Sequence, residues 1–112
     1  MRKIAKVKND SNVKRVMIYS CKDGVYLFLY KDNKDSPSYA DYWFEDIKDA
    51  EEVCTEDYGL TINDWQIIDD PLPDCQHDII ATIRVKGRNL AKPEWGKYEK
   101  LEDGKWQPFE FK

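Results

Sequence analysis

Hydrophobic side chains cluster in two stretches near the N-terminus, and their pattern predicts a β-hairpin. Residues 16–21 (VMIYSC) and 25–30 (VYLFLY) are rich in β-branched and aromatic side chains, which favour extended backbone. The Asp-Gly pair at 23–24 favours a tight turn between them, because glycine tolerates positive φ. This turn would place Tyr19 opposite Phe28. Both faces of the hairpin would then be apolar, which predicts a position inside a sheet that is covered on both sides.

After residue 44 the spacing of the apolar positions becomes helical, with intervals of three and four residues. The recurring residues are Ile47, Ala50, Cys54 and Tyr58. Acidic residues separate them, so the pattern predicts one acidic amphipathic helix over about residues 45–58. Gly59 is a suitable terminator, because it can adopt the left-handed cap conformation. One helix covers only one face of a sheet, so the C-terminal hairpin, a second subunit or a ligand is expected to cover the other.

The remaining apolar segments predict further strands. Residues 65–68 and 79–86 have strand character, and prolines follow the first of them. Residues 94–101 and 105–111 predict a second hairpin around an Asp-Gly turn at 103–104. That turn would pair Leu101 with Trp106 and Tyr98 with Phe109, which are favourable cross-strand contacts. The expected fold class is therefore α+β, with a largely antiparallel sheet, two hairpins and one main helix, in a single domain over residues 1–112.

Composition supports a folded chain. The 112 residues include 41% hydrophobic and 13% aromatic side chains, which is enough to form a core without a disulfide or metal. No apolar run has the length of a signal peptide or a membrane-spanning helix. The three cysteines are an odd number, which favours reduced thiols and a cytoplasmic location.

Charge is strongly segregated along the chain, although the net charge is only −4. Residues 32–78 hold 15 acidic and two basic residues, a net charge of −13, and the rest of the chain carries +9. Such an acidic segment either keeps the surface solvated or meets a basic partner, whose approach it accelerates. The partner would be a basic protein, including one that normally binds nucleic-acid phosphates, and a homodimer is also compatible.

Aromatic residues at 39–44 precede the helix and add contact area to this acidic segment. Aromatic side chains among charges are typical of protein interfaces. We expect Trp43 and Phe44 to anchor the helix in the core and the two tyrosines to be half exposed. The leading expectation is therefore a non-enzymatic protein-binding domain without a cofactor. Its candidate contact residues are Tyr39, Asp41, Tyr42, Glu45, Asp49, Glu52, Glu56 and Asp57.

Nucleic-acid binding by the C-terminal hairpin is the alternative hypothesis. Cations interleave with tryptophan and tyrosine there, so phosphates could be neutralised while bases stack on the rings. The candidate residues are Arg84, Lys86, Arg88, Lys97 and Lys100. The same tryptophans can equally pack in the core, and a pI of about 5.0 is low for a nucleic-acid-binding module.

Cys75 and His77 form a third, weaker candidate, because a thiolate and an imidazole can bind zinc or act as nucleophile and base. Zinc requires three or four protein ligands, and the chain has no Cys-x-x-Cys pair. The alternative is a structured loop in which the side chains around His77 hydrogen-bond to backbone groups. We therefore predict no metal site and no catalytic residue.

Overall fold

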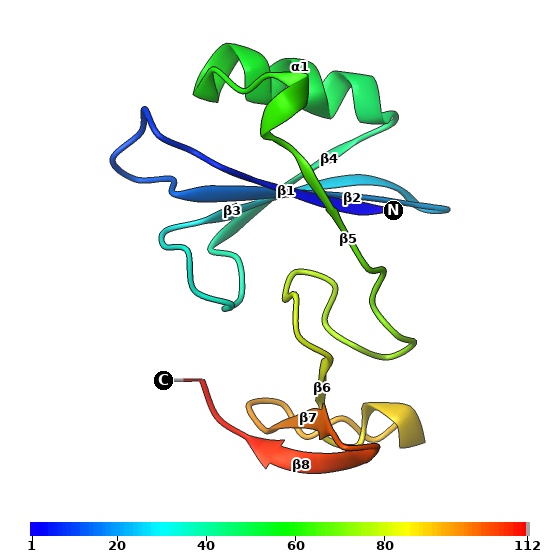
Figure 1. The fold of residues 1–112 in the computed structure, drawn as a ribbon. Coiled ribbons are helices and arrows are strands. Elements are labelled where there is room, and N and C mark those ends of the chain that lie inside the picture. The colour runs from blue at the N-terminus through cyan, green and yellow to red at the C-terminus, as the bar shows by residue number, and fades with distance from the viewer. Residues whose placement is uncertain (112) are drawn as a thin grey trace.

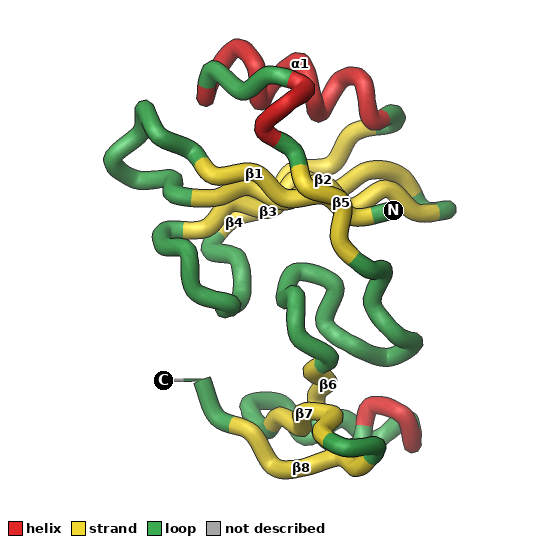
Figure 2. Tube along the Cα trace, viewed as in Figure 1, coloured by secondary structure: helices red, strands yellow, loops and turns green. Residues whose placement is uncertain are grey.

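The computed structural model describes residues 1–111 and contains two antiparallel sheets and one α-helix (Figures 1 and 2). The larger sheet has the strand order β4-β3-β2-β1-β5. Its strands are β1 (Arg2–Lys6), β2 (Arg15–Cys21), β3 (Gly24–Tyr30), β4 (Ala40–Phe44) and β5 (Gln66–Ile68). The smaller sheet consists of β6 (Ile83–Val85), β7 (Tyr98–Glu102) and β8 (Lys105–Phe109) in the order β6-β7-β8. The predicted α+β class with two hairpins is confirmed.

The single α-helix, α1 (Ile47–Tyr58), covers one face of the larger sheet (Figure 1). Two short 3₁₀ helices, η1 (Ile62–Asp64) and η2 (Arg88–Leu90), lie in the connections. In residues 1–111 we find no helix whose length and apolar character would allow it to cross a membrane.

The first hairpin forms, but the predicted register is wrong by two residues. Tyr19 lies opposite Tyr26, and Cys21 lies opposite Gly24, so the turn residues are Lys22 and Asp23. Gly24 has φ +123° and begins β3, and a Cβ atom there would lie 2.3 Å from the indole nitrogen of Trp43. Side chains alternate with a period of two, so this shift leaves every residue on its predicted face.

The sequence pattern did not predict β4, and it gave no range for β1 either. Residues 40–44 pair with β3 at the edge of the sheet instead of forming a loop before the helix. Phe44 packs against the helix-side core, as expected. Trp43 does not, because it faces the opposite side of an edge strand and is 52% exposed. Its indole N–H donates a 3.1 Å hydrogen bond to the carbonyl of Asp23.

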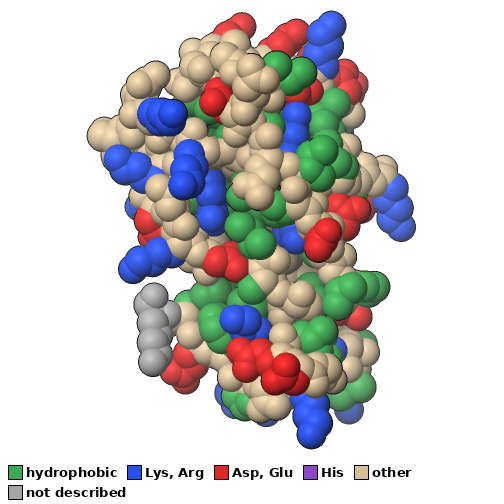
Figure 3. Space-filling view, viewed as in Figure 1, with side chains coloured by type: hydrophobic (Ala, Val, Ile, Leu, Met, Phe, Trp, Pro, Cys, Tyr) green, Lys and Arg blue, Asp and Glu red, His purple; other side chains and the backbone are tan. Residues whose placement is uncertain are grey.

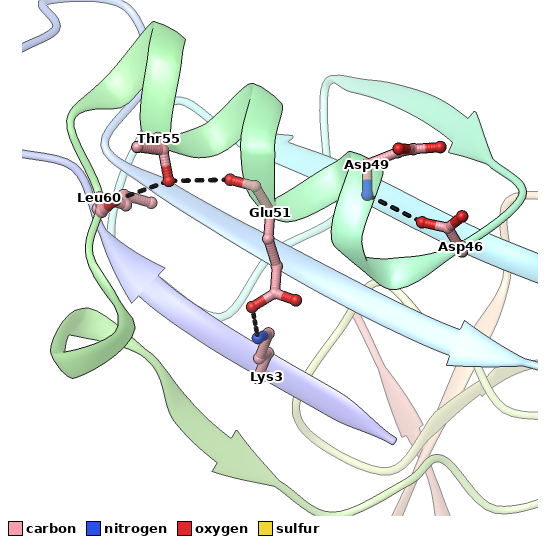
Figure 4. A network of polar contacts seen from close by, with 6 residues as sticks. All are labelled: Lys3, Asp46, Asp49, Glu51, Thr55 and Leu60. Atoms are coloured by element: carbon pink, nitrogen blue, oxygen red, sulfur yellow. Dashed lines mark hydrogen bonds and ion pairs between the residues drawn. The ribbon is translucent and has the colours of Figure 1, made fainter.

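α1 has the predicted stripe and the predicted end. Asp46 caps its start by accepting a 3.0 Å hydrogen bond from the backbone N–H of Asp49 (Figure 4). Gly59 ends it with φ +67°. Ala50 and Cys54 are fully buried against β-strand residues. Burial raises the pKa of the Cys54 thiol to about 12, so Cys54 acts as a small apolar group.

Residues 69–82, here called the strap, cover the other face of the larger sheet. The C-terminal hairpin, which was one of the expected covers, does not pack there. The His77 ring packs on Phe28, Tyr26 and Tyr19 at centroid distances of 5.3, 5.6 and 5.5 Å. Ile80 contacts the same apolar cluster. An irregular segment without hydrophobic periodicity thus completes the core, which is why its role was not apparent from the sequence.

Polar side chains from the sheet anchor the strap. The Arg2 guanidinium is 2% exposed and donates to the carbonyls of Asp69 at 2.7 Å and Ile79 at 2.8 Å. Longer bonds of 3.2 and 3.5 Å reach the carbonyls of His77 and Ile80. These contacts satisfy backbone groups that no neighbouring strand pairs.

Other anchors hold the same part of the strap. The Tyr30 hydroxyl donates to the carbonyl of Asp78. The Asp78 carboxylate accepts from the N–H of Ser38 at 2.9 Å, and the Asp35 carboxylate accepts from the N–H groups of Ile80 and Ala81, both at 2.7 Å. Residues 79–82 therefore belong to the strap, and the strand predicted over 79–86 is confined to β6.

The second hairpin has the predicted register. Leu101 lies opposite Trp106 and Tyr98 opposite Phe109, around a turn at Asp103 and Gly104 with φ of +50° and +76°. This is a turn in which both central residues have positive φ, and Asp-Gly suits it. The strands are shorter than predicted, because residues 94–97 form a turn before β7.

Candidate functional site

The candidate contact residues on α1 form one exposed ridge. Asp49, Glu52 and Glu56 follow each other at intervals of three and four residues, and all three are exposed. Figure 3 shows acidic side chains along the helix at the top of the molecule. We call Asp49, Glu52 and Glu56 the acidic ridge.

The acidic ridge forms no close ion pair within residues 1–111, although Lys48 lies one helical turn before Glu52. Glu51, which lies beside it, forms a 2.8 Å ion pair with Lys3 of β1 (Figure 4). Among residues 1–111, no basic group lies within 4.0 Å of an acidic-ridge carboxylate. The negative charge of the acidic ridge is therefore presented to the solvent.

The acidic ridge lies on the side of α1 that faces away from the sheet. Ala50 and Cys54 are buried against the sheet, and helical geometry places Asp49, Glu52 and Glu56 on the opposite, outward side of α1. α1 packs against β2, β3 and β4, and β4 has no neighbouring strand on its outer side within residues 1–111. The acidic ridge and the outer edge of β4 are thus two exposed features of the helix-side half of the larger sheet.

The edge strand exposes aromatic side chains. Tyr42 is 56% exposed and Trp43 is 52% exposed, and Tyr39, just before β4, is 45% exposed. Tyr42 pairs with Leu27 and faces the helix side, whereas Trp43 faces the strap side with Asp41. Adjacent residues of a strand point to opposite faces, so the predicted contact residues of β4 are divided between its two faces.

The other predicted contact residues lie at the margins of this surface. Glu45 is exposed between β4 and the N-cap of α1. Asp57 is exposed, but consecutive residues of a helix point in different directions, so Asp57 lies outside the acidic ridge. The Lys31 ammonium lies 5.1 Å from the ring centre of Tyr39.

The basic residues of the alternative nucleic-acid surface are mostly paired with carboxylates. Arg84 lies 3.2 Å from Glu99, and its guanidinium carbon lies 3.8 Å from the centre of the Trp106 ring. Lys86 and Lys97 share Glu94 at 4.0 and 3.5 Å. Lys100 lies 3.8 Å from Glu102, and Arg88 is exposed in η2. Trp95 is 76% exposed, so one aromatic ring of this region is available for stacking.

Cys75 and His77 lie in different surroundings within the strap. Burial raises the pKa of the Cys75 thiol, which keeps it protonated and a weak nucleophile. Burial among aromatic rings lowers the pKa of His77, against the opposing effect of Asp78. No group of three potential metal-ligating side chains occurs among residues 1–111.

The structure also contains a cleft that the sequence did not indicate. It has a volume of about 990 Å³ and lies between the loop after β3 and the smaller sheet. Tyr98, Phe109 and Phe111 line it, and the Phe111 ring packs edge-on against the other two at 4.9 and 5.0 Å. The pairing of Tyr98 with Phe109 was predictable, but the loop residues that complete the cleft carry no sequence signal.

Comparison with known proteins gave no match among protein families, curated proteins or solved structures. The function proposed below therefore rests on the residues and the geometry of this chain.

Proposed function

We propose that this chain is a non-enzymatic protein-binding domain that binds a basic partner through the acidic ridge and the exposed Tyr42 of β4. The observation that supports the proposal is the lack of ionic partners for Asp49, Glu52 and Glu56 within residues 1–111. Cys21, Cys54 and Cys75 form no disulfide among residues 1–111, which fits a reducing cytoplasmic location.

The two parts of the surface have complementary roles in binding. Unpaired carboxylates attract a basic partner over long distances and disfavour acidic competitors. Tyr42, on the helix side of β4, provides the kind of rigid aromatic contact area that is typical of interface anchors. Charge alone would give weak, salt-sensitive association, so Tyr42 is the part of this surface that adds specificity to binding.

The nucleic-acid alternative has less support from the ionic contacts. Of its five candidate cations, only Arg88 has no carboxylate within 4.0 Å among residues 1–111. Paired cations release fewer counter-ions on binding phosphate, so affinity for a polyanion is reduced. The exposed Trp95 is still available to stack on a base. A gel-retardation assay with RNA and DNA at low salt is expected to show no binding.

A comparative capture experiment tests the proposed function. Wild-type protein, the charge-reversal variant E52K/E56K and the matched control E102K/E110K are immobilised, and proteins retained from lysate are quantified by mass spectrometry. Both variants change the net charge by the same amount, and all four positions are exposed. We expect basic proteins to bind the wild type and the control and to be lost from E52K/E56K.

The control separates a specific surface from general electrostatics. Retention of the same proteins by E52K/E56K would contradict the proposal, and equal loss from both variants would show that only net charge matters. A second pair, Y42A and W95A, tests the aromatic contribution. Y42A is expected to weaken capture, whereas W95A, at the opposite end of the molecule, is expected to leave it unchanged.

A further inference from the structure

A small pocket lies at the end of β1 that leads into the loop 7–14. Its volume is about 320 Å³. Its lining residues come from three strands and three connecting segments, and Figure 3 shows basic side chains gathered over this end of the sheet, on the left. The residues used below are Lys6, Lys8, Arg15, Asn33, Asn63 and Asp64.

Two cations face each other across neighbouring strands in this pocket. Lys6 of β1 lies directly opposite Arg15 of β2, and both side chains are on the strap side because they alternate with Ala5 and Val16 of the helix-side core. Like charges at such positions repel each other. Lys8 lines the same pocket, and no carboxylate among residues 1–111 lies within 4.0 Å of any of these three cations.

Arg15 is a buried cation with unused hydrogen-bonding capacity. It is 5% exposed, and its two terminal nitrogens donate to the carbonyls of Asn33 at 3.5 Å and Lys34 at 2.9 Å. Its guanidinium carbon lies 4.6 Å from the centre of the Tyr30 ring. The Nε–H group is buried and has no hydrogen-bond partner. Burying a positive charge without an anion is unfavourable, so the arrangement favours an external counter-ion.

The polar neighbours of these cations are compatible with an anion. The side-chain amides of Asn33 and Asn63 can donate hydrogen bonds. Asp64 is the one acidic residue of the lining, and its Oδ2 atom already accepts from the N–H of Thr61 at 2.8 Å and from its hydroxyl at 3.1 Å. The pocket therefore retains a net positive charge.

We propose that this pocket binds the phosphoryl group of a small molecule, with Lys6, Lys8 and the buried Arg15 as its cationic contacts. A phosphoryl group carries the negative charge and the several acceptor oxygens that ammonium, guanidinium and amide donors bind best. The pocket is at the lower end of the size range of ligand sites, which favours a small phosphate ester or free phosphate over a large ligand. This site is separate from the acidic ridge and does not depend on the proposed protein-binding function.

Thermal unfolding and NMR titration with defined probes test the site. Inorganic phosphate and glycerol phosphate are compared with sodium chloride at equal ionic strength, so that general screening is subtracted. The variants are K6Q/K8Q and the matched control K22Q/K105Q, in which two exposed lysines elsewhere lose the same charge. The Arg15 Nε–H signal gives a direct readout of the buried guanidinium.

We expect phosphate to raise the midpoint of unfolding of the wild type and the control more than chloride does, and to shift the Arg15 Nε–H signal. K6Q/K8Q is expected to bind at least tenfold more weakly. Without phosphate it should unfold at the same or a higher temperature than the wild type, because the repulsion of Arg15 by Lys6 is removed. Tighter binding of glycerol phosphate than of inorganic phosphate would identify an ester as the ligand, and the reverse order would identify free phosphate.

Three results would overturn the proposal. The first is a phosphate effect no larger than that of chloride. The second is an unchanged phosphate response in K6Q/K8Q, and the third is an Arg15 Nε–H signal that does not move at saturating probe. If K6Q/K8Q is less stable than the wild type without phosphate, phosphate binding to its folded fraction is measured by NMR titration. A phosphate affinity equal to that of the wild type would then overturn the proposal as well.

Discussion

Replacing Arg2 by methionine tests whether a single buried guanidinium holds the strap on the sheet. Methionine has a similar length and keeps the apolar part of the side chain, but it removes all four hydrogen bonds to strap carbonyls. The two short bonds, at 2.7 and 2.8 Å, dominate the effect. Each hydrogen bond to a charged donor contributes about 1.5–3 kcal/mol. The desolvation of the guanidinium, which burial imposes and which lowers the pKa of Arg2, offsets part of this gain.

The expected net loss is therefore about 3 kcal/mol in the free energy of unfolding. A chain of 112 residues has an unfolding entropy of about 0.24 kcal/mol/K, so this loss lowers the unfolding midpoint by about 13 °C. Urea unfolding followed by tryptophan fluorescence measures the free energy. Hydrogen exchange with mass spectrometry locates the change, because backbone amides of residues 69–82 should exchange faster while those of α1 keep their relative protection.

The matched control is R88M, which removes an exposed arginine from η2 and should change stability by less than about 0.5 kcal/mol. A loss below about 1 kcal/mol in R2M would refute the reasoning, since the carbonyls would then find water or other donors without cost. Uniformly faster exchange would also refute it, because the effect would not be specific to the strap.

Two further predictions concern the helix cap and the buried histidine. Asp46→Ala removes the hydrogen bond to the N–H of Asp49 and should lower stability by about 1 kcal/mol in urea unfolding, and an unchanged midpoint would contradict the capping role. Burial lowers the pKa of His77, so the folded state disfavours its protonation and stability should fall as the pH decreases from about 7.5 to 5.5. His77→Phe keeps an aromatic ring on Phe28 and should remove most of this pH dependence, and an identical pH profile in both proteins would contradict the assignment.

The sequence predicted those elements whose determinants are local. The Asp-Gly turn at 103–104 defined the second hairpin register, because few other residue pairs accept positive φ at both positions. The stripe through Ala50 and Cys54, followed by Gly59, defined the helix and its end. In the first hairpin the same Asp-Gly signal was misleading, because Gly24 is required as a strand residue beneath the indole of Trp43, a contact 19 residues away.

Elements defined by long-range contacts were not predictable. β4 has no strong alternation, and only its pairing with β3 makes it a strand. The strap has no periodic pattern, and Arg2 and Tyr30, which hold it, are distant in the sequence. The candidate acidic ridge was predictable because helical periodicity places its members together, whereas the division of the aromatic residues between two faces followed from a strand that had not been foreseen.

The fold changes what the acidic segment means. Its charge of −13 was interpreted as a solvated surface or as a contact for a basic partner, but several of its carboxylates serve internal contacts. Asp35 and Asp78 accept hydrogen bonds that hold the strap and the loop before β4, Asp46 caps α1, and Glu51 pairs with Lys3. A carboxylate that is needed for folding cannot also be optimised for a partner without a cost in stability. The carboxylates of the unpaired acidic ridge form no ion pair within residues 1–111 that stabilises the fold. Charge reversal there should therefore alter binding and leave stability nearly unchanged.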